Sequence, residues 1–247
     1  ETSDKERFVK EIEEALLDER IDMAVHSAKD VPARLPEGLA IVGVPDRADP
    51  RDAVCGAASL DALAEGAVVG TASVRRRSQL LAARPDLDVR EVRGNVDTRL
   101  GKLAAGDYDA LVLAAAGLAR LGRDEGEPVT ADVMLPAPGQ GCLALEARKG
   151  DTVATEAAVE LTDFAALVAL TAERALVARL EATCDTPVGA FARLEDGALV
   201  LHGYAGTPDG ATWIRDGLEG PAKEPAALGV AVGERMLAAG ARQVLDG

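Results

Sequence analysis

Apolar positions recur along this chain at two spacings, and these spacings predict alternating helices and strands. Phe8, Ile12 and Leu16 lie four residues apart, which is typical of one face of a helix, here ending near Asp18. Ser3-Asp-Lys-Glu6 has the form of a capping box and predicts the start of that helix. Short aliphatic runs bounded by turn residues predict buried strands. We expect strands at residues 21–25, 40–44, 68–69, 89–92, 110–113 and 142–146.

The order of these elements indicates an α/β protein in three parts. Between residues 68 and 113 each strand is followed by a helical segment, the alternation of a parallel sheet. The last third instead predicts a small α+β unit of helices at 164–180 and 225–239 and strands at 187–194, 199–205 and 212–215. We expect a first domain from residues 1–47 and 141–160, a second from 50–138 and a third from 164–247.

Composition excludes several classes of protein. Of the 247 residues, 48% are hydrophobic, but no apolar run reaches the ~20 residues of a membrane span, so we expect no membrane segment. The start of the chain has no signal-peptide character. Cys55, Cys142 and Cys184 are odd in number and lack metal-ligand spacing, and His26 and His202 lie far apart. We therefore expect a cytoplasmic protein without a disulfide framework or a metal site.

Arginines gather in one short stretch of a chain whose formal net charge is −15. Acidic surfaces repel polyanions, so the overall negative charge argues against nucleic acid as a partner. A cationic cluster within such a chain predicts a recessed site for small anionic groups. The alternative is that the arginines are solvated side chains that balance nearby acids. The cluster consists of Arg75, Arg76, Arg77, Arg93 and Arg99.

These arginines follow predicted strand ends. Gly70-Thr-Ala-Ser-Val-Arg-Arg-Arg77 follows one strand and opens a helix, so the Thr71 and Ser73 hydroxyls, backbone N–H groups and guanidiniums could converge on one anion. Arg93-Gly-Asn-Val-Asp-Thr-Arg99 repeats this arrangement after the next strand, and Arg120 follows a third. The carboxyl ends of parallel strands share a crevice, which predicts one cleft. Guanidiniums suit carboxylates and phosphates alike, but the chain lacks the glycine-rich nucleotide motifs.

Two further segments carry candidate chemistry. Ser27, Lys29 and Asp30 follow a predicted strand and place a hydroxyl, an ammonium and a carboxylate together; an ionised Asp30 could stabilise a developing positive charge or pass a proton. Alternatively, Asp30 only caps the turn before Pro32. Cys184 lies in a polar loop where a thiol is accessible for covalent chemistry, although cysteine is more often a small buried hydrophobe.

With these residues in view, the chain resembles the hydroxymethylbilane synthase, or porphobilinogen deaminase, family along nearly its whole length. Several independent motifs occur in the family's order. They are Phe8-Val-Lys-Glu-Ile12, Ala24-Val-His-Ser-Ala-Lys-Asp30, Asp49-Pro-Arg-Asp52, Gly70-Thr-Ala-Ser-Val-Arg-Arg76, Arg93-Gly-Asn-Val-Asp-Thr-Arg99, Ala116-Gly-Leu-Ala-Arg-Leu-Gly122, Leu135-Pro-Ala-Pro-Gly-Gln-Gly141 and Leu180-Glu-Ala-Thr-Cys184.

The resemblance implies two periplasmic-binding-protein-like α/β domains and a small α+β domain with a dipyrromethane cofactor in thioether linkage to Cys184. It implies an enzyme of tetrapyrrole biosynthesis that joins four porphobilinogen molecules into hydroxymethylbilane with release of ammonia, usually as a monomer. Asp30 would be the catalytic carboxylate, and Arg120 and Gln140 would lie near the substrate. Residues expected to hold the carboxylates of the cofactor are Ser27, Lys29, Thr71, Ser73, Arg75, Arg76, Arg93 and Arg99.

The chain departs from the family pattern at its start. Family members normally begin with a strand, a helix and another strand, whose first loop supplies an Arg and a Ser to the site. This chain starts beyond them at Glu1, so either it is a fragment or an upstream segment has been left out. A fragment that stands alone would expose the first sheet and lack those active-site groups. The residues from Thr2 to Arg7 replace a glycine-rich segment, and no catalytic lysine is assigned there.

A non-enzymatic module that clamps a small di-acid is the main rival function, and a nucleotide or nucleic-acid binder is the second.

Overall fold

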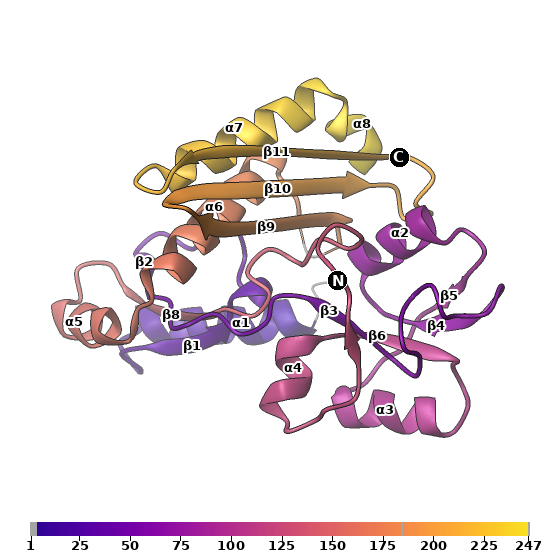
Figure 1. Ribbon diagram of the computed structural model, residues 1–247. Helices are drawn as coiled ribbons and strands as arrows, with labels where there is room; N and C mark the ends of the chain where they lie inside the picture. Colours follow the sequence, from indigo (N-terminus) through magenta and orange to yellow (C-terminus); the bar gives the residue numbers. More distant parts are fainter. Residues whose placement is uncertain (1–3, 184, 247) are drawn as a thin grey trace.

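The strands of the protein form three separate sheets (Figure 1). The computed structural model describes residues 4–183 and 185–246. The strands are β1 (Ala24–Ser27), β2 (Leu39–Gly43), β3 (Asp52–Cys55), β4 (Val68–Gly70), β5 (Asp88–Arg90), β6 (Ala110–Ala114), β7 (Glu127–Pro128), β8 (Leu143–Arg148), β9 (Val188–Glu195), β10 (Ala198–Gly206) and β11 (Trp213–Pro221). The α-helices are α1 (Asp4–Leu17), α2 (Val74–Ala83), α3 (Val96–Ala104), α4 (Ala115–Arg120), α5 (Thr152–Leu161), α6 (Phe164–Leu180), α7 (Pro225–Ala238) and α8 (Ala241–Asp246), and Ala28–Asp30 form one 3₁₀ turn, η1.

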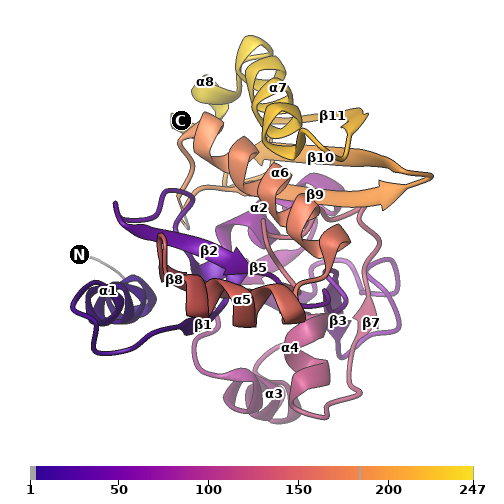
Figure 2. The same ribbon diagram turned by 90° about the vertical axis from the view of Figure 1, so that its left-hand side faces the viewer.

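The first sheet is antiparallel, with β8 between β1 and β2. Helix α1 lies beside this sheet (Figure 2) and packs Leu16 against Ala24 and Leu39, which confirms the helix predicted from the four-residue spacing. The capping residue expected at Ser3 lies outside the described residues. Strand β1 has only β8 as a neighbour among the described strands, and Val25 is 61% exposed.

The second sheet is mixed, in the order β5-β4-β6-β3-β7. Strand β4 is parallel to β5 and β6, as the strand–helix alternation predicted, but β3 runs antiparallel to β6 and β7. The pattern of apolar residues did not predict β3, because its first residue, Asp52, is charged. All four residues of β3 are buried.

The third sheet is an antiparallel meander of β9, β10 and β11, packed against α6 and α7 (Figure 1). The side chains of Asp151 and Asp163 cap α5 and α6 by accepting hydrogen bonds from the Ala154 and Ala166 N–H groups at 2.9 and 2.7 Å, which fixes where these helices begin. Strand β11 is longer than the predicted 212–215, and α8 was not predicted. The α/β class with a smaller C-terminal α+β unit is confirmed.

Two polypeptide crossings join the first and second sheets and run close together. The first crossing, residues 44–51, connects β2 to β3, and the second, residues 129–142, connects β7 to β8. The Ala48 N–H in the first crossing donates to the Gly141 carbonyl in the second at 3.2 Å. Gly141 has a φ of +88°, and a Cβ there would lie 2.4 Å from the Ala48 carbonyl oxygen, so only glycine allows this approach.

Within the described ranges, 4–183 and 185–246, no helix combines the length and the apolar character that crossing a membrane requires.

Candidate functional site

Four of the predicted site residues line one small pocket beside the two crossings. Ser27 and Lys29 come from the end of β1 and the turn after it, Arg120 from the end of α4, and Gln140 from the second crossing. The pocket has a volume of about 70 Å³, and small residues of β6 and α4, such as Ala114, form another part of its wall. The structure therefore brings together cationic groups that lie far apart in the sequence.

Asp30 ends the η1 turn that carries Lys29 and is half-buried. The turn forms because the Val31 N–H donates to the Ala28 carbonyl at 3.3 Å, and the Ala28 N–H is held by the Cys142 carbonyl at 3.0 Å. The second crossing packs tightly against this turn, since a Cβ at Gly139 would lie only 3.0 Å from Ala28. The turn is thus attached to the crossing that supplies Gln140.

Arg75 and Arg76 face inward and share one buried carboxylate, Asp52. Arg75 Nη1 donates to Asp52 Oδ2 at 2.6 Å, and Arg76 Nε donates to Asp52 Oδ1 at 2.8 Å. Gln140 Nε2 donates to the same Oδ1 at 3.0 Å. Burial alone would raise the pKa of Asp52, but Arg75 and Arg76 outweigh it and hold this pKa well below its ordinary value. Two cations therefore share one anion within the protein, and the cluster keeps a net positive charge.

Other residues expected from the sequence lie at the ends of β4 and β5 but not in the small pocket. Ser73 caps α2 by accepting from the Arg76 N–H at 3.4 Å, and the Thr71 hydroxyl accepts from the Ser73 N–H at 3.2 Å. The Arg93 side chain is 82% exposed and pairs with Glu91 at 2.7 Å.

Arg99 differs from Arg93 in its surroundings. Its Nε donates to the Gly94 carbonyl at 2.7 Å, burial lowers its pKa, and no carboxylate among the described residues pairs with it. Arg99 also lies near enough to Arg76 to contribute to the lowered pKa of that residue, whose main cause is burial. Its charge is therefore available to an anion beside the buried pair.

The sequence did not reveal that one carboxylate, Glu173 of α6, holds both crossings. Arg47 of the first crossing donates Nη1 to Glu173 Oε1 at 2.7 Å, and the Gly139 N–H of the second donates to Oε2 at 2.7 Å. The Ala192 N–H of β9 donates to Oε1 at 2.8 Å. Burial alone would lower the pKa of Arg47, but Glu173 more than offsets this and raises it. The only signal in the sequence is that Glu173, followed by Arg174, interrupts a largely apolar helix.

Another pair of buried acidic residues, Glu13 and Glu146, lies near His26, the residue before the Ser27–Asp30 segment. His26 Nε2 is 3.0 Å from Glu146 Oε2, and both side chains are almost completely buried. Burial is the main cause of a raised pKa at Glu13, and Glu146 raises it further while His26 lowers it. Neither Glu13 nor Glu146 was expected from the sequence to take part in the site.

The cysteines differ in what the structure shows of them. Cys55 and Cys142 are buried, as predicted, and burial raises their pKa values to about 11 and about 12. Cys184, the expected point of cofactor attachment, lies outside the described residues. The described residues contain no group of three or more His, Cys, Asp or Glu side chains that could hold a metal ion.

Comparison with protein families shows which family the chain belongs to. Residues 1–156 match the model of the porphobilinogen deaminase dipyrromethane cofactor binding domain, and residues 167–238 match that of the porphobilinogen deaminase C-terminal domain. The chain belongs to the porphobilinogen deaminase family. It is thus a transferase of tetrapyrrole biosynthesis with dipyrromethane as its cofactor. Because this is a family of enzymes, membership in it argues against the main rival function, a non-enzymatic binding module.

Similar porphobilinogen deaminases include that of Roseiflexus castenholzii, 50% identical over 99% of this chain and 82% of the relative. The Thermus thermophilus enzyme is 51% identical over 96% of this chain and 81% of the relative.

Two solved structures are more distant. The periplasmic VFT2 domain of Bordetella pertussis BvgS has a TM-score of 0.33 and 18% identity over 60% of this chain and 63% of that one. YhfZ from Shigella flexneri has a TM-score of 0.34 and 22% identity over 69% of this chain and 78% of that one.

Proposed function

We propose that this porphobilinogen deaminase family member joins four porphobilinogen molecules into hydroxymethylbilane in the pocket lined by Ser27, Lys29, Arg120 and Gln140. The observation that carries the proposal is that this pocket gathers an ammonium and a guanidinium in a chain whose net charge is −15. Acetate and propionate groups on each pyrrole are the complementary charges, and guanidinium groups bind carboxylates with two parallel hydrogen bonds.

The size of the pocket requires a movement of its walls. Sites for small molecules usually have volumes of about 300–1,000 Å³, whereas this pocket has about 70 Å³. Its walls come from the first sheet, from α4 beside the second sheet, and from the second crossing. Admission of a pyrrole chain therefore requires the first two sheets to separate.

Asp30 is proposed as the catalytic carboxylate. It lies in the same turn as Lys29, which lines the pocket. In each condensation the C–N bond of the protonated aminomethyl group breaks, its electron pair leaves with nitrogen as ammonia, and positive charge remains on the carbon. An ionised Asp30 lowers the energy of that cation and can then accept the proton that the other pyrrole carbon loses when the C–C bond forms.

The pocket also suits the dipyrromethane cofactor. Gln140 Oε1 is buried and accepts no hydrogen bond within the described residues, so it is available to a pyrrole N–H. Lys29, Arg120 and Arg99 are proposed to bind the cofactor's carboxylates, with the Ser27 hydroxyl beside them. When bound, dipyrromethane supplies the primer to which the first substrate is joined. Its attachment to Cys184 is part of the proposal.

The remaining predicted residues have different proposed roles. Arg75 and Arg76 hold the ends of β3 and β4 together through Asp52, and a ligand carboxylate near them would compete with that buried anion. Thr71 and Ser73 shape the turn before α2, and Arg93 reaches a ligand only if it leaves Glu91. We further propose three domains with the boundaries expected from the sequence, a monomeric state and a cytoplasmic location.

The decisive experiment replaces Asp30 by Asn and measures both turnover of porphobilinogen and intact mass. Loss of a catalytic acid–base group costs about 10²- to 10⁴-fold in rate, while the mass of attached dipyrromethane should persist. Asp22→Asn is a matched control, since that side chain is 85% exposed and its pair with Arg148 lies at the surface. In Cys184→Ser the extra mass should be missing. Wild-type turnover in Asp30→Asn, or full activity in Cys184→Ser, would reject these assignments.

A further inference from the structure

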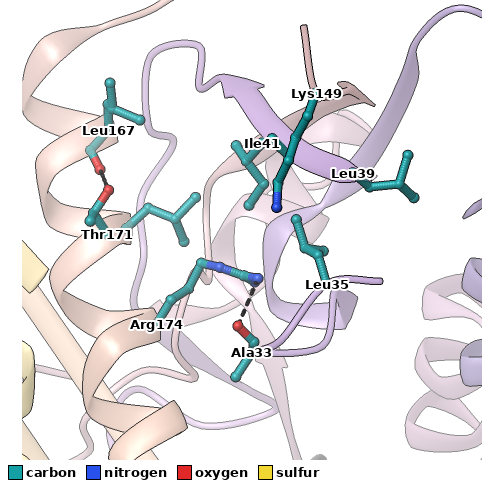
Figure 3. Close-up of a pocket in the computed structure, with 10 residues that line it drawn as sticks. Ala33, Leu35, Leu39, Ile41, Lys149, Leu167, Thr171 and Arg174 are labelled. Atoms are coloured by element: carbon teal, nitrogen blue, oxygen red, sulfur yellow. Dashed lines mark hydrogen bonds between the residues drawn. The ribbon is translucent and has the colours of Figure 1, made fainter. Parts of the chain in front are cut away.

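A second pocket, larger than the one around Lys29 and Arg120, lies away from the catalytic cleft. It has a volume of about 390 Å³, within the range common for small-molecule sites, and it shares no lining residue with the pocket around Lys29 and Arg120. Figure 3 shows its walls: β2 with Leu39 and Ile41, the loop that carries Leu35, and α6 with Leu167. The pocket thus lies between the first sheet and the helix that supports the third.

Two cationic side chains enter this largely aliphatic pocket. Arg174 extends from α6 and donates Nη2 to the carbonyl oxygens of Pro32 and Ala33 at 2.6 and 3.2 Å, and the Lys149 ammonium lies above it (Figure 3). Burial lowers the pKa of Arg174, with Glu146 as a weaker opposing influence. Within residues 4–183 and 185–246, neither Arg174 nor Lys149 has a carboxylate within 4.0 Å.

This lack of a close counter-ion distinguishes Arg174 and Lys149 from most cationic side chains of the described residues. Most arginines outside the cleft pair with Asp or Glu, including Arg148 on the strand that precedes Lys149 and Arg179 on the same helix as Arg174. A positive pocket in so acidic a chain attracts an anion, and its leucine and isoleucine walls favour an apolar body.

We propose that this pocket binds a small carboxylic acid with an apolar body, its carboxylate between Arg174 and Lys149 and its body against Leu35, Ile41 and Leu167. The backbone carbonyls of Pro32 and Ala33 already fix the position of the Arg174 side chain, so little side-chain entropy is lost when the acid binds. The aliphatic walls release water without leaving polar groups unpaired. Phosphates and other purely polar anions do not use these walls and bind weakly.

Isothermal titration calorimetry of the cofactor-loaded protein with 2-naphthoate tests the proposal, with uncharged 2-naphthamide as the matched ligand. We expect 2-naphthoate to bind with one-to-one stoichiometry and 2-naphthamide at least tenfold more weakly. Arg174→Gln should weaken 2-naphthoate binding about tenfold or more, and Lys149→Gln several-fold. Arg179→Gln, whose side chain faces α7 and does not line the pocket, should bind like the wild type.

The catalytic cleft also attracts carboxylates, so Arg120→Gln identifies the site. Binding that survives in Arg120→Gln and weakens in Lys149→Gln supports the proposal, while the reverse pattern places the probe in the cleft and overturns it. Equal affinity for acid and amide, or no saturable heat at millimolar 2-naphthoate, also overturns it. If Arg174→Gln fails to fold, the affinity of Lys149→Gln for 2-naphthoate tests the proposal by itself. The Lys149 side chain is exposed and makes no hydrogen bond or ion pair within the described residues, so this variant should fold normally. The heat of binding is independent of turnover, so failure here leaves the synthase activity untouched.

Discussion

Replacement of Asp52 by Asn tests whether the two arginines before α2 are primarily structural. Asp52 is completely buried and is the one carboxylate between Arg75 and Arg76, with Gln140 as a further donor. Asparagine keeps the shape but removes the negative charge, and its amide group replaces one of the two accepting oxygens by an NH2 donor. The variant therefore leaves two buried cations without a counter-ion.

Loss of one partner of a buried ion pair costs about 3–5 kcal/mol, and two cations facing one anion place Asp52→Asn toward the upper end of that range. For domains of this size each kcal/mol corresponds to about 2–4 °C in melting temperature. We thus expect Asp52→Asn to melt roughly 6–20 °C below the wild type at pH 7.5 by differential scanning calorimetry, since 3–5 kcal/mol is multiplied by 2–4 °C.

The pH dependence gives an independent check. Because the pKa of Asp52 is held below its ordinary value of 3.8, its stabilisation is present above that value and disappears as pH falls through the lower folded-state pKa. The gap between wild type and variant should therefore narrow only in strong acid. Asp49→Asn is the control, since its pair with Arg51 is partly exposed and should matter little. A melting point for Asp52→Asn within 2 °C of that of Asp49→Asn would refute the structural assignment.

Three further predictions follow from buried groups. Glu13→Gln should raise the melting temperature at pH 7.5, because burial and Glu146 raise the pKa of Glu13 and disfavour its ionised form; the gain should vanish below pH 4.5, and a lower melting point at pH 7.5 would contradict it. Native Cys55 and Cys142, with pKa values of about 11 and about 12, should resist iodoacetamide at pH 7.5 in a peptide mass map, whereas rapid labelling of either would show that it is accessible. Glu173→Gln should lower the urea midpoint by the equivalent of about 3–5 kcal/mol because Arg47 stays buried without its partner, and an unchanged midpoint would count against this role.

The elements that the sequence predicted best are those determined by local signals. The helix expected at 164–180 has those bounds in α6, because Asp163 caps its start and apolar residues continue along it. Strand β3 was missed because its stability depends on residues elsewhere: Asp52 can be buried in a strand only because Arg75, 23 positions later, reaches it. A single sequence shows the charges but not their pairing.

The same distinction separates the parts of the candidate site. Placement at strand ends predicted a common cleft for the arginines, and the family resemblance implied that Ser27 and Lys29 belong to the same site. The structure brings Ser27, Lys29 and Arg120 to one pocket. Arg75 and Arg76 were also expected to hold a ligand's carboxylates, but the fold turns both side chains inward to Asp52. Sequence spacing fixes which edge of a sheet a side chain occupies, while tertiary packing determines whether its charge is left for a ligand.

Both connections between the first two sheets are fastened to α6 through the carboxylate of Glu173. Pulling these sheets directly apart would break bonds to a buried charge, whereas rotation about an axis near Glu173 keeps them. The rotation costs less, so we expect the C-terminal unit to be the pivot of any such opening. Widening of the cleft for each added pyrrole should then leave distances around Glu173 constant while those across Lys29 and Arg120 increase.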